Sequence, residues 1–329
     1  MKYQYNTLYR NIKIKDINPN SPTYGSLSSS LAFSPNTCCN RRGYLLIDRS
    51  KLSSYSGPVL SLFNVYYISD LTHLITHVGA VNQEIKGVNL PYAISVNRDA
   101  FNYRYALSSV YMPRVTYIGE SAFYSCTSLT SIVINEATYL DDLCFYDCKL
   151  LSSISIPKVS HIGSSCFAFC NHLLSINLPQ LTLVPEYAFS ACLKMSSVSL
   201  PMVTKIEASG FFNCKSLTSI DLPNVKTIGS NAFDSCINLS NINMPQLRYI
   251  GDRAFYRCSN LVNLTFPNVT SIGYSAFYEC TNLTTISLPQ CSKIYEYTFL
   301  SCSKLKSIYV QSSYISLLTS IYSSLYVGI

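Results

Sequence analysis

Residues 267–288 read PNVTSIGYSAFYECTNLTTISL, and this stretch decides the fold because the chain repeats it. The common pattern is P-x-V-x-x-I-G-x-x-A-F-x-x-C-x-x-L-x-x-I-x-L, and ten consecutive copies of 22 residues fill positions 91–310 without an insertion. Phenylalanine holds the same position in all ten copies, from Phe101 to Phe299. A repeat of this length is one supersecondary unit that buries its apolar side only by stacking on its neighbours. The sequence therefore predicts a solenoid.

Each copy contains one clear strand signal and one short turn signal. The segment L-x-x-I-x-L ends in alternation, as in Ser-Ile-Asp-Leu at 219–222, and the following proline stops the strand because it lacks an N–H donor. The A-F-x-x-C stretch has room for a single helical or 3₁₀ turn. The predicted fold class is an α/β-type repeat solenoid of 22-residue coils. A parallel sheet is expected on one face, short helical or 3₁₀ turns on the other, and caps at both ends.

Two further columns of the repeat carry structural expectations. Glycine follows the V-x-x-I segment in five copies, which predicts a positive φ at those positions: Gly119, Gly163, Gly229, Gly251 and Gly273. Nine cysteines share one column, from Cys126 to Cys302. Stacked coils place such residues about 4.8 Å apart with parallel Cβ vectors, which do not give disulfide geometry. The column is therefore interpreted as a ladder of buried free thiols.

The regularity of the pattern divides the chain into four segments. Residues 91–310 are the ten regular coils, and residues 47–90 are interpreted as degenerate capping coils in which the A-F element is missing. Residues 1–46 are expected to form an N-terminal cap or an attachment segment, and residues 311–329 a C-terminal cap. Solenoids need such terminal units to cover the core of the first and last coils.

Charge and hydropathy limit the classes of function. Residues 1–51 hold eight Lys or Arg against two Asp, a net of +6, whereas the ten repeats hold 15 basic and 13 acidic residues, a net of +2. The repeats show no basic face interleaved with aromatic residues, so no nucleic-acid partner is expected. The chain has no run of 18 apolar residues and no apolar segment at its start, so neither a transmembrane segment nor a signal peptide is expected.

Candidate ligand-binding residues are those that point outward in the predicted coil. Tyrosine offers a large contact area at a low cost in conformational entropy, and it recurs beside the phenylalanine column and around the first turn. The alternative is that these rings form a stabilising ladder between coils. The polar residues that face outward on the strands form the second set. The candidates are Tyr117, Tyr124, Tyr139, Tyr146, Tyr249, Tyr256, Tyr274, Tyr278, Ser155, Asn177, Asp221 and Asn243.

Chemistry-bearing constellations are weak in this sequence. His73 and His77 lie four residues apart, but no acidic or cysteine partner lies at a spacing typical of metal ligands. No glycine-rich phosphate loop or nucleophile elbow is present. The sequence thus predicts no catalytic residue, no metal site and no cofactor, and the expected class is a protein without enzymatic activity.

The stretch PNVTSIGYSAFYECTNLTTISLP at 267–289 resembles the BspA-like, treponemal class of leucine-rich repeat proteins, whose motif joins L-P, A-F-x-x-C and L-x-x-I-x-L-P at this spacing. The resemblance covers about two thirds of the chain and implies a curved solenoid used for adhesion, without a shared active site. The first expectation is therefore a protein on the cell surface or outside the cell that binds a protein or glycan on another cell or matrix. The alternatives are a receptor-binding protein on a phage or virus-like particle, and a cytoplasmic interaction scaffold.

Overall fold

The computed structural model describes residues 86–311, apart from positions 92 and 296, and three further strands at 59–61, 67–68 and 326–328. The chain divides into two units, Met1–Val159 and Ser160–Ile329, and each is described by itself. The predicted N-terminal cap at 1–46 lies outside the described residues, as do the histidine pair at 73 and 77 and most of the predicted C-terminal cap.

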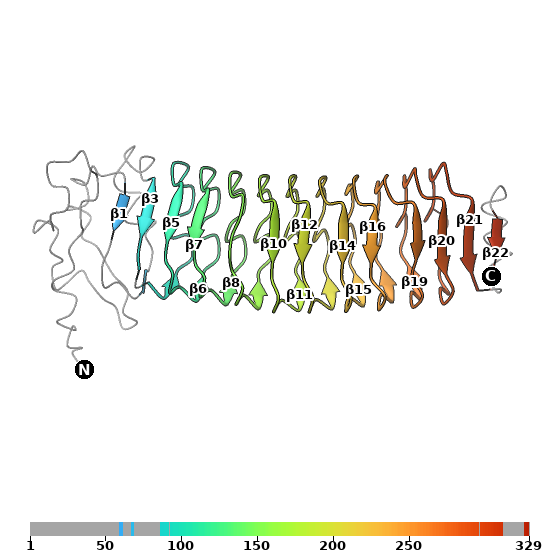
Figure 1. Ribbon diagram of the computed structural model, residues 1–329, viewed down its shortest axis with the longest axis horizontal. Coiled ribbons are helices and arrows are strands. Elements are labelled where there is room, and N and C mark those ends of the chain that lie inside the picture. The colour runs from blue at the N-terminus through green and yellow to red at the C-terminus, as the bar shows by residue number, and fades with distance from the viewer. Residues whose placement is uncertain are drawn as a thin grey trace, which may run out of the picture. The chain divides into compact units, whose positions relative to one another are not determined.

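The first unit is built from two parallel ladders of strands, with one strand of each ladder in most coils (Figure 1). Successive strands of each ladder pair in parallel. The long-strand ladder contains β1 (Val59–Ser61), β3 (Gly87–Asn89), β5 (Ser109–Tyr111) and β7 (Ser131–Val133). The short-strand ladder contains β2 (Tyr67–Ile68), β4 (Ser95–Val96), β6 (Tyr117–Ile118) and β8 (Tyr139–Leu140).

The second unit repeats this arrangement. Its short strands are β9 (His161–Ile162), β11 (Leu183–Val184), β13 (Lys205–Ile206), β15 (Thr227–Ile228), β17 (Tyr249–Ile250) and β19 (Ser271–Ile272). The last five of them form one parallel sheet in chain order. The long strands are β10 (Ser175–Asn177), β12 (Ser197–Ser199), β14 (Ser219–Asp221), β16 (Asn241–Asn243), β18 (Asn263–Thr265), β20 (Thr285–Leu288), β21 (Ser307–Val310) and β22 (Tyr326–Gly328).

The repeat period explains both ladders. In-register pairs are 22 residues apart, as in Ile220 with Ile242 on the long strands and Ile206 with Ile228 on the short ones. The long-strand ladder and its inward apolar column confirm the predicted parallel sheet, whereas the short-strand ladder is additional. It forms at the V-x-x-I segment, where only two residues per coil extend, which is too short for a visible alternation.

The phenylalanine column is buried and stacked, as predicted. Phe233 is fully buried, and its ring centroid lies 5.3 Å from that of Phe211 and 5.4 Å from that of Phe255, with planes within 5° of parallel. The cysteine ladder is also confirmed, since every described cysteine is buried and free. The Cys258 thiol donates a hydrogen bond to the Phe233 carbonyl oxygen of the preceding coil at 3.0 Å. Burial raises the pKa of the Cys126 thiol to about 12.

The A-F-x-x-C segment differs from the predicted helical turn. The described residues contain no helix, and hence none that is long and apolar enough to cross a membrane. In the coil at 229–236 alternate amides close tight turns, Ala232 N to Gly229 O at 3.4 Å and Asp234 N to Asn231 O at 3.1 Å. The amides between them bond the next coil, Asn231 N to Asp252 O and Phe233 N to Ala254 O, both at 2.8 Å. This third ladder between coils excludes a helix, in which all amides point along one axis.

Positive φ angles accompany this ribbon of turns, and they do not fall on the predicted glycines. Asn231 and Ser235 have φ of 55° and 61°, and the equivalent residues of the other coils behave alike. A turn of this kind needs a positive φ at its third residue. The glycine column instead reflects the close approach of successive coils. A Cβ on Gly251 would lie 2.5 Å from the Gly229 carbonyl carbon and 2.7 Å from its oxygen.

Candidate functional site

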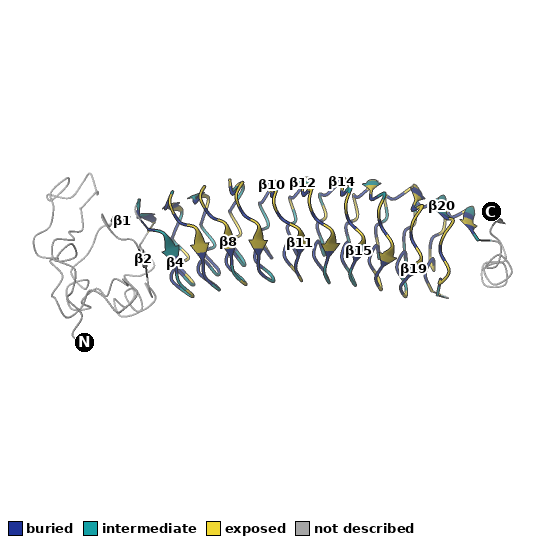
Figure 2. Cartoon of the chain, turned by 90° about the horizontal axis from the view of Figure 1, so that it is seen from below, coloured by how far each residue is buried: buried dark blue, intermediate teal, exposed yellow. Residues whose placement is uncertain are grey.

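The predicted strand residues lie on the outside of the long-strand ladders. Ser155, Asn177, Asp221 and Asn243 are all exposed, in a pattern that recurs from coil to coil (Figure 2). The Asn243 amide donates a hydrogen bond to the Asp221 carboxylate at 2.7 Å, which joins β14 to β16. These short polar side chains bond their neighbours in the ladder, and they offer a ligand little area to bury.

The tyrosines of the first unit form two stacked pairs. On the short strands, Tyr117 and Tyr139 stack with ring centroids 5.4 Å apart, and the Tyr117 hydroxyl donates to the Asp141 carboxylate at 2.8 Å. Desolvation and this hydrogen bond raise the pKa of Tyr117. In the turn segment, Tyr124 and Tyr146 stack at 4.7 Å and are half-buried. The pairs lie on different segments of the coil, so the first unit presents two aromatic rows.

The tyrosines of the second unit have different surroundings. Tyr256 and Tyr278 stack at 4.8 Å and are half-buried, whereas Tyr274 is exposed and stacks on Tyr295 at 3.9 Å. Tyr249, on β17, is 43% exposed and has no ring partner among the described residues. The predicted tyrosines therefore do not converge on one site. Both interpretations of the tyrosine columns hold in part, because most rings form ladders while their edges and hydroxyls stay accessible.

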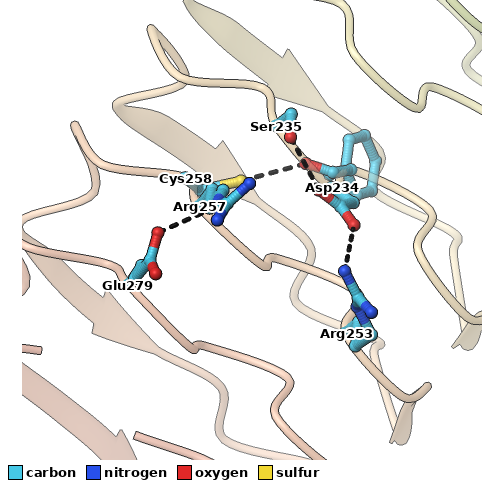
Figure 3. A network of polar contacts seen from close by, with 7 residues as sticks. Asp234, Ser235, Arg253, Arg257, Cys258 and Glu279 are labelled. Carbon is cyan, nitrogen blue, oxygen red and sulfur yellow. Dashed lines mark hydrogen bonds and ion pairs between the residues drawn. The ribbon is translucent and has the colours of Figure 1, made fainter. Parts of the chain in front are cut away.

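A cluster of charged residues surrounds Tyr256, and sequence reasoning missed it (Figure 3). The Arg253 and Arg257 guanidinium carbons lie 4.1 and 5.0 Å from the centre of the Tyr256 ring. Arg257 bonds Glu279 in the next coil at 2.7 Å, and Arg253 lies 3.5 Å from the Asp234 carboxylate. The spacing of these residues along the chain, 19 to 22, is the signal that indicates a contact between coils in a 22-residue repeat.

Burial governs the acid in this cluster. The Asp234 side chain is only 4% exposed, and desolvation raises its pKa although Ser235 and Arg253 hydrogen-bond its carboxylate. The Ser235 hydroxyl donates to the carboxylate at 2.7 Å. Because its oxygens already have partners within the protein, Asp234 holds three coils together through Arg253 and Tyr256 rather than waiting for a substrate. Across the part of the chain that the structure describes, no three His, Cys, Asp or Glu side chains are grouped as a metal site.

Replacing Tyr256 by serine should lower the free energy of unfolding by about 1–2 kcal/mol, since a stacked ring pair and a guanidinium contact are lost. An exposed Tyr256 would have made this change nearly neutral, but the half-buried ring contacts Tyr278 and Arg253. The matched control is Tyr249→Ser, where no ring partner is lost and a change within about 0.5 kcal/mol is expected. Urea denaturation of both variants measures the difference, and equal losses would contradict the structural role of Tyr256.

Comparison with known proteins places this architecture. A family model described as the BspA type leucine rich repeat region matches residues 94–218, 182–306 and 226–327, in six copies. A leucine-rich repeat protein from Bacteroides ovatus is 29% identical and covers 72% of this chain, with a TM-score of 0.62. The match covers 64% of that protein, so this chain spans just under two thirds of its length. No curated protein matches.

Two weaker likenesses have the same repeat character. The T. pallidum leucine rich repeat protein is 28% identical over 41% of this chain and 58% of its own, with a TM-score of 0.33. A leucine rich cell surface protein from Faecalibacterium prausnitzii is 23% identical over 71% of this chain and 86% of its own, with a TM-score of 0.38. The argument rests on the family model, which covers most of the chain and agrees with the coils in the structure. The chain belongs to the BspA type leucine rich repeat family.

Proposed function

We propose that this chain is a recognition protein without enzymatic activity, which binds a protein or glycan on a cell surface or matrix through the exterior of its coils. Proteins of the BspA type are generally surface-associated interaction proteins, which supports this class and a location at the cell surface or outside the cell. Fold alone does not determine a ligand. The specific support comes from how residues vary between coils.

One observation carries the proposal, namely the contrast between the inside and the outside of equivalent positions. The interior phenylalanine is the same in every coil, whereas the outward residue of the short strand changes from coil to coil. In chain order that outward position holds Tyr117, Tyr139, His161, Leu183, Lys205, Thr227 and Tyr249, six of them exposed. Packing does not require this variety, since one residue type would satisfy a ladder. A surface that recognises a ligand needs it, because specificity depends on distinct side chains.

The rigid framework suits such a role. Three ladders of backbone hydrogen bonds fix the spacing of the coils, so exposed side chains are held in place before a ligand arrives. Preorganisation reduces the entropic cost of binding. Affinity would be distributed over several coils, and a single outward substitution should weaken binding less than the loss of two coils.

The test is binding of the labelled full-length chain to intact bacterial and animal cells. Saturable binding to one cell type, displaced by excess unlabelled chain, is the expected result. Absence of saturable binding by correctly folded protein to any cell or matrix preparation would contradict the proposal, and would favour an internal interaction scaffold instead.

A further inference from the structure

Two adjacent coils of the second unit break a rule that the other coils follow. The residue before each short strand is serine or threonine in seven copies of the repeat: Thr116, Thr138, Ser160, Thr182, Thr204, Thr270 and Ser292. Its hydroxyl hydrogen-bonds a carbonyl oxygen of the preceding coil, as Thr204 does to Thr182 at 3.3 Å and Thr270 to Arg248 at 3.2 Å. In the coils of β15 and β17 this residue is Lys226 and Arg248.

These two cations are direct neighbours without a neutralising acid. The Arg248 amide bonds the Lys226 carbonyl oxygen at 2.8 Å, and Thr227 pairs in register with Tyr249. Both side chains are exposed, and neither has an acidic partner among the described residues. Lys205, one coil earlier, differs because it bonds Glu207 at 2.8 Å. Like charges on facing strand residues destabilise a sheet, so this pair costs stability without a structural return.

An aromatic ring and a third cation continue the row. Tyr249 follows Arg248 directly, pairs with Ser271, and is exposed without a ring partner among the described residues. Lys293 lies one coil beyond Ser271, because the Ile272 amide bonds the Lys293 carbonyl oxygen at 3.1 Å. Its ammonium lies 5.1 Å from the centre of the Tyr295 ring. A hydrogen bond with Tyr295 raises the pKa of Lys293, and Tyr249 acts in the same direction, which places Lys293 near that ring. Lys226, Arg248, Tyr249 and Lys293 are called the basic strip.

We propose that the basic strip binds a linear anionic glycan, whose sulfate or carboxylate groups meet Lys226, Arg248 and Lys293 while a sugar ring packs on Tyr249. The proposal rests on the proposed function and names the ligand class of that surface. At about 4.8 Å per coil the strip extends about 14 Å along the sheet. Between the cations lie the hydroxyl groups of Thr270, Ser271 and Ser292, which suit the hydroxyl-rich backbone of a sugar chain.

Other anionic partners fit less well. A peptide that adds a strand needs a free sheet edge, but β15 and β17 are paired on both sides, so an acidic peptide would have only side-chain contacts. A single-stranded nucleic acid needs a series of unoccupied aromatic rings for successive bases. The strip has one such ring, since Tyr274 is already stacked on Tyr295.

The test measures affinity of the full-length chain for immobilised heparin and for hyaluronan, with neutral dextran and a single-stranded thymidine oligonucleotide as comparison probes. The variant K226T/R248T restores the residue type of the other coils and should fold at least as well as the original. The matched control K194S/K215S removes the same charge from two exposed lysines in adjacent coils of the same unit, outside the strip.

Loss of at least tenfold in affinity for an anionic glycan in K226T/R248T, against less than threefold in the control, is the expected result. Heparin binding alone would identify sulfate as the recognised group, and equal binding of hyaluronan would identify carboxylate. Equal losses in both variants, binding of dextran as tight as heparin, or tighter binding of the oligonucleotide would each overturn the proposal. Cell binding without affinity for either anionic glycan would overturn it while leaving the proposed function intact. Glycan affinity without cell binding would do the reverse.

Discussion

Replacement of Phe233 by alanine lowers the free energy of unfolding by ~3–5 kcal/mol, the range for large-to-small changes in a well-packed core. The ring is fully buried and lies between the rings of Phe211 and Phe255. Its removal leaves a cavity that neighbouring coils cannot fill, because their backbone ladders hold them at a set spacing. Urea or guanidinium denaturation followed by circular dichroism measures the loss.

Phe233→Leu is the matched control for the phenylalanine column. Leucine keeps most of the buried volume, and a loss near or below 1.5 kcal/mol is expected for this smaller change. A loss under about 1 kcal/mol for the alanine variant would show that the stacked column does not stabilise the second unit, and this part of the account would be wrong.

Replacement of Gly251 by alanine is expected to lower the free energy of unfolding by ~1–3 kcal/mol through overpacking. The new Cβ would approach the backbone of Gly229 and Ser230 to 2.7 Å or less, and backbone atoms have little freedom to move away. Relief requires the two coils to separate, which weakens the hydrogen bond from the Gly251 amide to the Ile228 carbonyl oxygen, now 2.9 Å. Thermal and urea denaturation both report the change.

The chain contains its own control for this effect. Glu207 occupies the same repeat position as Gly251 and already carries a side chain, so Glu207→Ala should cost less than about 1 kcal/mol, the usual limit for an exposed ion pair such as the one with Lys205. Equal losses for Gly251→Ala and Glu207→Ala would contradict the explanation of the glycine column by close approach.

The interior of the coil could be predicted because its residues recur. Phe233 and Cys236 each belong to a column in which one residue type repeats at a fixed period, and only inward positions demand such constancy. The parallel long strands followed from the alternation around Ile220. Stacking of the rings and burial of the thiols then follow from the period itself.

The turn segment could not be predicted in the same way. Six residues such as 231–236 are too few to distinguish one helical turn from successive tight turns, because both place Phe233 inward. The difference lies in where Phe233 N–H points, and the bond to Ala254 O depends on a coil 21 residues away. Glycine at 251 has a similar cause, since its need arises from the approach of Gly229 and not from its own φ.

Exterior residues were predictable as columns but not as contacts. The spacing of Tyr256 and Tyr278 aligns their rings, yet whether aligned rings stack or turn toward solvent depends on local packing, and Arg253 adds a contact that the tyrosine pattern does not contain. The charge pair at Lys226 and Arg248 was accessible from the sequence. Its signal is a departure from a serine or threonine column, whereas attention to repeated residues selects against departures.

The most direct test of the account compares cell binding by variants that alter variable and constant exterior positions. Y117S/Y139S/Y249S removes outward tyrosines of the short strands, and T116S/T138S/T204S keeps the hydroxyl of the constant position beside that row. Melting curves establish that each variant is folded. The account predicts at least a tenfold loss of affinity for the tyrosine variant and less than a twofold change for the threonine variant. A folded tyrosine variant that binds cells as tightly as the original chain would contradict the claim that recognition lies on the variable exterior of the coils.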